Sequence, residues 1–319
     1  MCRGPAGCFF FTGLLDADGG CDRLGSAAQL VGYKLNNAAK KMITIIPEKS
    51  PLQVLWDYLC QNHGEMLRSP LCPVVISVAM YFIACLFYTI LDGLSSVMPA
   101  VNRYRIHSEQ PVKLKSVLKA LALTFYNHIV FVFPASVAQW YWRPPLPLED
   151  TAPTVMEFTV HILGCMVLFD SQYYLWHWAH HKSKWLYATF HAVHHEFSQP
   201  FCWVTQYMSA WEVASVGFWT TINPVLLGCH SLTGFFFMMF NIWVSVDDHS
   251  GYDFPWSLHN VIPFNLWGGS PKHDTHHRSP STNYAPYFSH WDWVSGTSSD
   301  YLVSPAMAEK KKRGHKTIS

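Results

Sequence analysis

Histidine is the residue whose number and spacing point most directly to chemistry in this chain. Nine of its 18 histidines lie in three short clusters, "HWAHH" at 177–181, "HAVHH" at 191–195 and "HDTHH" at 273–277. Residues three and four positions apart share one face of a helix, so the second and third clusters each predict a stripe of three imidazoles. In the first cluster His177 and His181 share a face, and His180 ranks below them.

These imidazoles predict metal binding, with more ligands than one ion needs. A structural zinc site takes four ligands and a catalytic zinc takes three, whereas the clusters supply eight once His180 is set aside. Eight imidazoles suit two ions that keep open coordination positions. Imidazole binds iron, zinc and copper alike, so the ligands alone do not name the metal. Ordinary polar packing explains a single histidine, but not three clusters of matched spacing.

A zinc protease is the nearest competing motif, and its pattern is absent. That motif is H-E-x-x-H, in which the glutamate is the general base. Here Asp274 follows His273 and Ala192 follows His191. The protease interpretation is therefore weak.

Further polar residues near the clusters are candidates for the same site. His249 in "DDHSGYDFPW" is expected as a ninth ligand. Asp253 and His259 are candidate tenth ligands, with a supporting or structural role more consistent with their positions. Asp170 lies seven residues before His177, where a carboxylate can accept the second N–H of a ligand histidine or act as an interfacial cap. Glu196 is a further supporting candidate beside the second cluster.

Long uncharged stretches predict the helices that must position these clusters. Residues 72–91 can cross a bilayer core of about 30 Å, and 120–142 form a second candidate span. A third runs from about 158 to 176 and leads directly into His177. Residues 213–246 lack Asp, Glu, Lys and Arg but are too long for one span, and Asn223-Pro224 predicts a break into a bent pair of helices that returns to the same side.

Loop charges predict the orientation of these spans. The segment 92–119 is rich in Lys and Arg, which favours the cytosol, whereas 143–157 is mainly acidic and suits the lumen. The third span then delivers His177 to the cytosolic face, and the bent pair keeps the third cluster and the basic "KKKR" tail there. All three clusters are thus expected on one side of the membrane.

Composition supports this class and excludes others. Hydrophobic residues make up 50% of the chain, aromatic residues 16% and charged residues 13%, about half the charge of a typical soluble domain, roughly 25%. The prediction is an all-α polytopic membrane protein with about four to five membrane-embedded helices and a cytosolic histidine-rich helical cap. Nine scattered cysteines without a C-x-x-C pair argue against a disulfide framework or a cysteine zinc site. A net charge of +1, with no basic run beside stacking aromatics, argues against a nucleic-acid partner.

The order of these motifs resembles the fatty acid hydroxylase and sterol desaturase superfamily. The motifs are H-x-x-x-H at 177–181, H-x-x-H-H at 191–195, "HSGYDFPW" from His249 and H-x-x-H-H at 273–277. Flanking stretches such as "WLYATFHAVHH", "TQYMSAWE" and "NIWVSVDDHSGYDFPWS" favour the branch that hydroxylates C25 of cholesterol over the C4-methyl sterol oxidases. The resemblance covers about residues 51–300. It divides the chain into an irregular extension (1–50), a membrane-embedded hydroxylase domain (51–300) and a basic tail (301–319).

The resemblance implies a di-iron monooxygenase of the endoplasmic reticulum membrane. Such an enzyme takes a sterol (cholesterol) from the lipid, uses O₂, and draws electrons from an NADPH-dependent reductase or a cytochrome b5 system. Zinc is expected as a substitute for iron in purified protein. Carried over by position, the metal ligands are His177, His181, His191, His194, His195, His249, His273, His276 and His277. Alternatives are a C4-methyl sterol oxidase, a fatty acyl hydroxylase, or a catalytically silent sterol-binding membrane protein.

Overall fold

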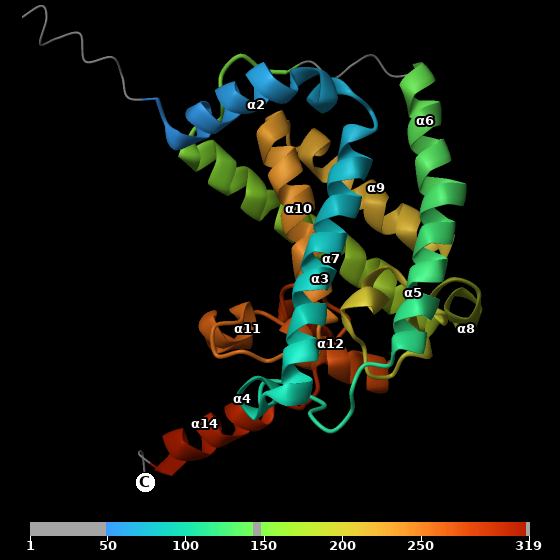
Figure 1. Cartoon of the computed structure of the whole chain (residues 1–319), viewed down its shortest axis with the longest axis vertical. Helices are drawn as coiled ribbons and strands as arrows, with labels where there is room; N and C mark the ends of the chain where they lie inside the picture. Colours follow the sequence, from blue (N-terminus) through green and yellow to red (C-terminus); the bar gives the residue numbers. More distant parts are fainter. Residues whose placement is uncertain (1–48, 143–147, 317–319) are drawn as a thin grey trace, which may run out of the picture. The chain divides into compact units, whose positions relative to one another are not determined.

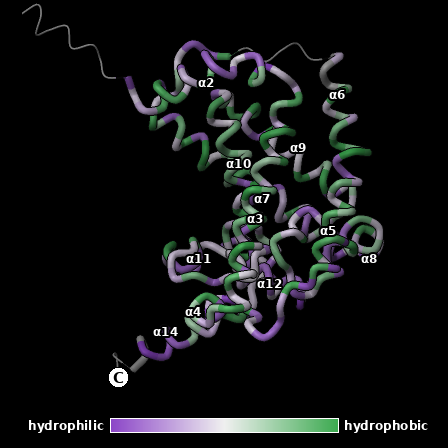
Figure 2. Tube along the Cα trace, in the orientation of Figure 1, coloured by the Kyte–Doolittle hydropathy of each residue, from purple (hydrophilic) through white to green (hydrophobic). Residues whose placement is uncertain are grey.

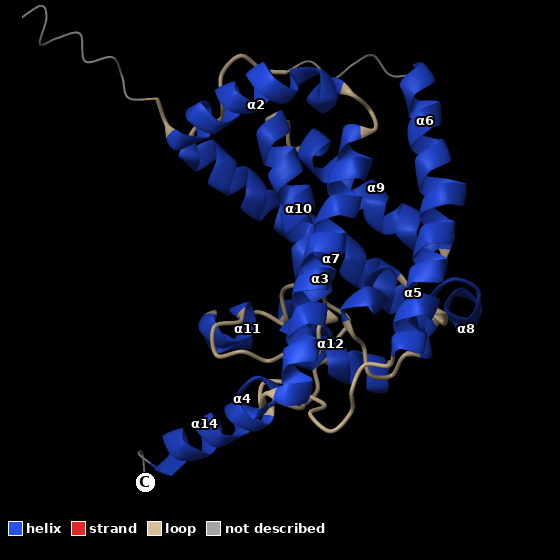
Figure 3. Ribbon diagram, viewed as in Figure 1, coloured by secondary structure: helices blue, strands red, loops and turns tan. Residues whose placement is uncertain are grey.

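The computed structural model describes residues 49–142 and 148–316, and within these ranges the chain is helical, with no strand (Figure 3). The expected all-α class is therefore confirmed for the described residues, while nearly all of the expected extension over 1–50 lies outside them. The helical elements are α2 (Pro51–Arg68), α3 (Cys72–Val97), α4 (Pro99–Asn102), α5 (Leu114–Asn127), η1 (His128–Val132), α6 (Phe133–Trp142), α7 (Val155–Lys182), α8 (Lys184–Leu186), η2 (Tyr187–His191), η3 (His194–Glu196), η4 (Cys202–Gln206), α9 (Ala210–Leu226), α10 (Ser231–Asp248), α11 (Leu258–Val261), η5 (Pro263–Asn265), α12 (Gly269–Arg278), α13 (His290–Ser295) and α14 (Pro305–Lys316).

Two helical segments of the described chain are long and apolar enough to cross a membrane. They are α3, over Cys72–Val97, and the continuous run of α5, η1 and α6, over Leu114–Ala138. Figure 2 shows hydrophobic residues along these helices and hydrophilic ones around α12 and α14. The first two predicted spans thus correspond to helices of the required length and composition, and the total of four to five membrane-embedded helices stays a prediction.

The predicted bent pair forms, but its break lies beyond the expected dipeptide. Pro224 is inside α9, which continues to Leu226, and the chain turns at Gly228, whose φ is 61°. Pro224 has no backbone N–H, so one i→i−4 hydrogen bond is missing near the end of α9, yet the helix continues for two residues beyond it. Glycine adopts the left-handed φ of the turn without steric cost. The predicted break at Asn223-Pro224 was therefore wrong by about four residues.

Helix α10 is the central element of the fold. It packs against α3, α7, α9 and α12, and Figure 1 shows it between these helices. One buried cluster joins α3 to the segment around η4 through side chains that include Tyr81, Cys85 and Trp203. A second joins α7 to α10 through Phe169 and Phe237. These two cores hold α7, α10 and the loop that carries the second histidine cluster in fixed positions.

The long helix α7 carries the first histidine cluster to its end. A capping box formed by Thr154 and Glu157 begins the helix by satisfying orphan backbone donors. The helix runs 28 residues and ends at Lys182, so His177 and His181 lie in its last two turns. The apolar stretch and the histidines that follow it in sequence thus form one continuous helix, with the histidines at its C-terminal end.

The C-terminal tail begins as an ordered part of the fold. The backbone N–H of Ser304 donates to the carboxylate of Asp253, at 2.9 Å, and that of Ala306 donates to the carbonyl of Arg103, at 3.0 Å. Helix α14 then extends through the basic residues. The start of the segment assigned to the tail therefore packs on the domain before it.

Candidate metal centre

The nine predicted ligand histidines converge in space into two groups. The ring nitrogens within each group lie within 4.8 Å of one another. The first group is His177, His181, His191, His195 and His276, and the second is His194, His249, His273 and His277. Residues separated by a hundred positions in sequence are therefore neighbours, although their role as metal ligands stays a prediction.

The two H-x-x-H-H motifs divide between the groups in a reciprocal way. His191 and His195, four residues apart, join the first group, and His194 joins the second. In α12 the pair four residues apart, His273 and His277, joins the second group, and His276 joins the first. Each motif therefore spans both groups, because its middle histidine projects to a different side from the first and last histidines, which are four residues apart.

The second cluster does not lie on one regular helix, contrary to the prediction of a single helical stripe. His191 ends η2, a π-helical turn, and His194 and His195 begin η3, a 3₁₀ turn. Wide π turns inside a helix are frequently found at functional sites. The local change of helical pitch accompanies the division of these imidazoles, with His191 and His195 directed to the first group and His194 to the second.

Backbone carbonyls fix the rings of five of these histidines by accepting the Nδ1–H. The distances are 2.8 Å from His177 to Tyr284 O, 3.3 Å from His194 to Tyr207 O, 2.7 Å from His249 to Ser245 O, 2.7 Å from His276 to Thr282 O and 3.1 Å from His277 to Phe197 O. A carbonyl can only accept, so in each neutral ring the proton is on Nδ1 and Nε2 carries a lone pair. The tautomer that binds a metal through Nε2 is thereby selected.

These lone pairs face one another in an arrangement that suits a cation. The Nε2 atoms of His194 and His249 are 3.3 Å apart, and both rings have their Nδ1 proton held by a carbonyl. In the first group, Nε2 of His195 lies 3.0 Å from that of His191 and 3.1 Å from that of His276. One proton on His195 cannot satisfy both neighbours, whereas a metal ion among them would. The donor set therefore fits one ion in each group.

Burial keeps these imidazoles neutral. It lowers the pKa of His191, His249 and His276 from the usual 6.5 to about 3, because a buried charge loses its hydration. The pKa values of His273 and His277 are lowered by the same cause, with neighbouring histidines adding to it. Neutral imidazole is the form that binds metal ions.

Glu212 is the supporting residue that the sequence reasoning missed. Its two carboxylate oxygens lie 3.0 and 3.1 Å from Nδ1 of His191, and its side chain is fully buried. Burial raises the pKa of Glu212 to about 7. The signal was available in "SAWE", where Ser209 caps α9 by accepting the N–H of Glu212, so the acid sits at the polar entrance of an apolar helix.

The four supporting candidates predicted from sequence do not contact the histidine groups through a hydrogen bond. Asp170 is buried but accepts the backbone N–H of Tyr287 and Phe288, at 2.9 and 3.0 Å, so of its two predicted roles the bond to a ligand histidine is not formed. Glu196 lies partly exposed, paired with Lys119 and the hydroxyl of Tyr207. Each of these two carboxylates bonds to donors that the fold places beside it, namely two backbone amides for Asp170 and Lys119 with Tyr207 for Glu196.

Asp253 and His259 pair with each other, outside both groups. Nε2 of His259 is 2.9 Å from Asp253 Oδ1, and Asp253 also accepts from Asn260 and from the backbone of Ser304. Neither residue joins the ring nitrogens of the two groups. Their contacts hold the loop after His249 to the start of the tail, which suits the structural role that the sequence favoured for both residues over that of a tenth ligand.

His180 lies apart from the two groups, in agreement with its lower rank. Its ring stacks on Trp176, at 3.7 Å between centroids, and its Nδ1 donates to the carbonyl of Trp176 at 2.7 Å. It is absent from both sets of converging nitrogens. Within one turn of α7, His177 and His181 therefore face the first group while His180 packs against Trp176.

Comparison with known proteins adds a family to this geometry. A family model described as fatty acid hydroxylase matches residues 162–297. Cholesterol 25-hydroxylase-like protein 2 of Danio rerio is 55% identical over 271 residues, covering 85% of this chain and 96% of the relative. Cholesterol 25-hydroxylase of Homo sapiens is 47% identical over 246 residues, covering 77% and 90%. No solved structure matches the chain.

The chain belongs to the fatty acid hydroxylase family, in its cholesterol 25-hydroxylase branch. The matched residues of the fatty acid hydroxylase model include every member of both histidine groups and Glu212. A more distant member of the branch, the cholesterol 25-hydroxylase-like protein of Caenorhabditis elegans, is 31% identical over 260 residues. The resemblance predicted from the histidine spacing and the flanking stretches is thus confirmed, and the chain is a hydroxylase of this family.

Proposed function

We propose that this protein is a di-iron sterol hydroxylase that converts cholesterol to 25-hydroxycholesterol with O₂. The observation that carries the proposal is the convergence of nine imidazoles into two groups whose lone pairs face one another, as between His194 and His249 at 3.3 Å. Membership of the cholesterol 25-hydroxylase branch supports the sterol as substrate. Two neighbouring ions with open positions suit O₂ chemistry better than a closed structural site.

The chain's own residues would prepare the site in three ways. Backbone carbonyls hold five of the nine rings and Glu212 holds that of His191, each with Nε2 toward its group, so little reorganisation of these rings accompanies binding of the ions. Burial of His191, His194 and His276 excludes water from the reacting region. When bound, the iron pair supplies O₂ activation, a chemistry that no side chain of the protein provides by itself.

The overall reaction defines the external partners. Replacing the C25–H bond by C25–OH uses one oxygen atom of O₂, and the other leaves as water. This requires two electrons and two protons for each turnover, which an NADPH-dependent reductase or a cytochrome b5 system would deliver. The partners are therefore a sterol from the lipid phase, O₂ and an external electron donor.

The proposed location is the endoplasmic reticulum membrane, with the metal centre toward the cytosol. Two segments, Cys72–Val97 and Leu114–Ala138, are long and apolar enough to cross it. The loop between them is basic, which favours the cytosol. Electron donors of this type act on the cytosolic face, so the orientation supports the redox requirement.

The proposal is tested by expressing His194→Ala and His180→Ala in cells that lack oxysterol synthesis and profiling sterol products by mass spectrometry. His180→Ala is the matched control, since it removes a buried histidine of the same region that lies outside both groups. We expect His194→Ala to lose 25-hydroxycholesterol and at least one iron per chain, and His180→Ala to keep both. Full activity of His194→Ala would contradict the ligand assignment, and a C4-oxidised or fatty acyl product from wild type would contradict the substrate.

A further inference from the structure

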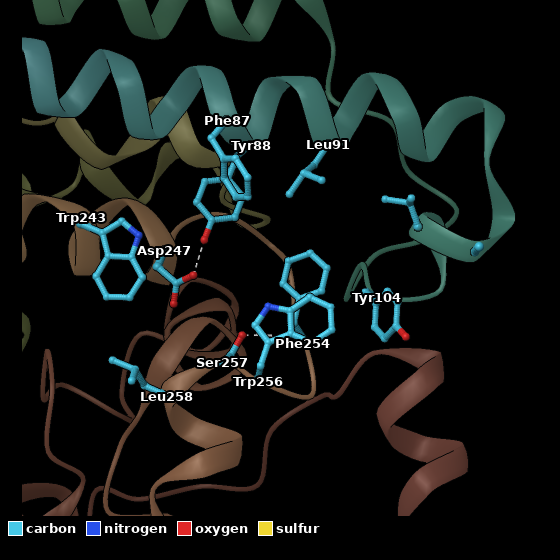
Figure 4. Close-up of a pocket in the computed structure, with 12 residues that line it drawn as sticks. Phe87, Tyr88, Leu91, Tyr104, Trp243, Asp247, Phe254, Trp256, Ser257 and Leu258 are labelled. Atoms are coloured by element: carbon cyan, nitrogen blue, oxygen red, sulfur yellow. Dashed lines mark hydrogen bonds between the residues drawn. The ribbon is translucent and has the colours of Figure 1, made fainter.

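A cavity of about 460 Å³ lies between α3, α4, the end of α10 and the segment 254–258 (Figure 4). Ligand sites for small molecules commonly measure about 300–1,000 Å³. Figure 4 shows Trp243 and Asp247 of α10 at one end and Tyr104 at the other, with Trp256 between them and α3 along one side. Among the described residues that line it there is no histidine, so the cavity is separate from the candidate metal centre.

The wall of this cavity suits a hydrocarbon chain. It consists mainly of apolar and aromatic side chains, such as Leu91 of α3 and Phe254. The carboxylate of Asp247 accepts the hydroxyl of Tyr88, and both side chains are buried. The hydroxyl oxygen of Ser257 accepts the backbone N–H of Phe254 at 3.3 Å. A polar ligand group placed here would have to displace an existing hydrogen bond, whereas methylene groups would not.

The cavity opens beside a candidate membrane span. At its rim, Phe87 of α3 is 56% exposed and Trp256 is 67% exposed. Helix α3 is apolar and long enough to cross a membrane, and Phe87 lies in its C-terminal half. The segment 92–119, which follows the apolar stretch of α3, is basic and favours the cytosol. In a membrane that α3 crosses, the mouth of the cavity would therefore face lipid of the cytosolic leaflet.

The end of the cavity at Tyr104 adjoins the basic helix α14. The guanidinium of Arg103 lies over the ring of Tyr104, 5.9 Å from its centroid. The carbonyl of Arg103 accepts the backbone N–H of Ala306 at 3.0 Å, and its side chain pairs with Glu309 of α14 at 3.0 Å. Figure 1 shows α14 extending from beside α4. The exposed residues 310–313, Lys-Lys-Lys-Arg, follow directly, so together with Arg103 they place five cations against the single carboxylate of that helix.

We propose that this cavity binds an anionic phospholipid of the cytosolic leaflet, with one acyl chain inside and the head group at the Tyr104 end. The chain enters between Phe87 and Trp256 and lies along the apolar wall toward Trp243. The phosphate stays near Arg103 and α14, because clustered basic residues at a membrane surface attract anionic lipid. A sterol lacks the negative charge that these cations select. The bound lipid contacts α3, α4 and α10 together and stabilises their packing.

The assignment is tested by photolabelling the purified full-length protein in phosphatidylcholine nanodiscs. The probe is a phosphatidylserine with a diazirine at the end of one acyl chain, and a phosphatidylcholine with the same diazirine is the matched control. Labelled peptides are mapped by mass spectrometry. Leu91→Trp places a large ring into the cavity from α3, and Ile90→Trp puts the same ring on the adjacent, 63% exposed position of that helix.

A second pair of variants tests the head-group end. Lys310→Gln/Lys312→Gln removes two positive charges from α14. Lys182→Gln/Lys184→Gln removes the same charge from two exposed lysines of α7 and α8, and Figure 1 shows α8 apart from α14. Unlabelled cholesterol and unlabelled phosphatidylserine are added in equal amounts as competitors.

We expect the phosphatidylserine probe to label 87–104 and 243–258 in the wild type and in Ile90→Trp, about fivefold or more above the phosphatidylcholine probe. Leu91→Trp should reduce this labelling about tenfold. Lys310→Gln/Lys312→Gln should weaken it about 20-fold, because each lysine near an anionic surface contributes about fivefold, and the control pair should leave it unchanged. Equal labelling by the two probes, label confined elsewhere, or equal labelling of the two tryptophan variants would overturn the proposal. Cholesterol that competes as well as phosphatidylserine would overturn the ligand class.

Thermal unfolding gives a measurement that does not depend on any variant. Because overpacking can disturb folding, each variant is first unfolded in phosphatidylcholine alone. Added phosphatidylserine should raise the unfolding temperature of the wild type and of Ile90→Trp but not that of Leu91→Trp. An unchanged unfolding temperature of the wild type would overturn the proposal. The lipid site and the proposed function fail independently, since phospholipid binding requires neither the metal nor the sterol.

Discussion

Replacement of Glu212 tests whether a buried acid maintains the metal centre through His191. Both carboxylate oxygens lie within 3.1 Å of His191 Nδ1, and no part of the side chain reaches solvent. The carboxylate holds the proton on Nδ1 and makes Nε2 a better donor to a metal. Glu212→Gln keeps the shape of the side chain and one acceptor oxygen but removes the charge. Glu212→Ala removes the acceptor as well.

The expected magnitude follows from these losses. Removing a partner that orients a ligand histidine typically lowers metal affinity about 10- to 100-fold, or about 1.4 to 2.7 kcal/mol. Glu212→Gln should lie near the tenfold end, because its amide oxygen can still accept from His191. Glu212→Ala should lie near the hundredfold end and also lower stability by about 1–3 kcal/mol, because a buried N–H is left without an acceptor.

The assay is metal retention during titration with a chelator, followed by elemental analysis and thermal unfolding in detergent. Glu196→Gln and Glu196→Ala are matched controls, since Glu196 neighbours His195 in sequence but is bonded to Lys119 and Tyr207 instead of a histidine. Wild-type retention in both Glu212 variants would refute the role in orienting His191. An equal loss in the Glu196 variants would show that the effect is not specific to the buried acid.

Two further predictions concern acid and the entry to α12. In metal-depleted protein, burial lowers the pKa of His191 from 6.5 in the unfolded chain to about 3, so the unfolded state binds more protons as pH falls below 6.5. The free energy of unfolding should therefore be level above about pH 7 and decline toward pH 3, and one such histidine lowers it by about 1.4 kcal/mol at pH 5.5. A thermal-unfolding midpoint that rises on acidification would contradict this. Gly269→Ala should lower the unfolding temperature and the iron content, because Gly269 has a φ of 66° and an added Cβ would clash with the ring of His259. Gly296→Ala, with a φ of 69° and open space around it, should cost only the backbone term of about 1–2 kcal/mol, so equal effects of the two variants would disprove the clash.

The amino-acid sequence by itself identified the members of the candidate metal centre and the family of the chain. The spacing of the clustered histidines is a local property of helical geometry, and it selected eight of the nine residues that the fold brings together. The ninth, His249, was expected from its own motif, "DDHSGYDFPW". Uncharged stretches likewise predicted the two long apolar helices, since span length depends only on rise per residue. His180 was ranked correctly for the same local reason.

Tertiary structure decided how these residues are divided and supported. The partition into five and four imidazoles depends on how α7, α12 and the π and 3₁₀ turns around His191 meet, which spacing does not specify. Backbone carbonyls from distant loops accept the Nδ1–H of four of these rings, and they belong to Phe197, Tyr207, Thr282 and Tyr284. Every residue has a backbone carbonyl, so the sequence does not indicate which ones will act as acceptors. Carboxylates can be recognised in a sequence, but their hydrogen-bond partners cannot. Asp170 accepts from two backbone amides and Glu212 pairs with His191, because a buried carboxylate bonds to the donors that the packing brings nearest.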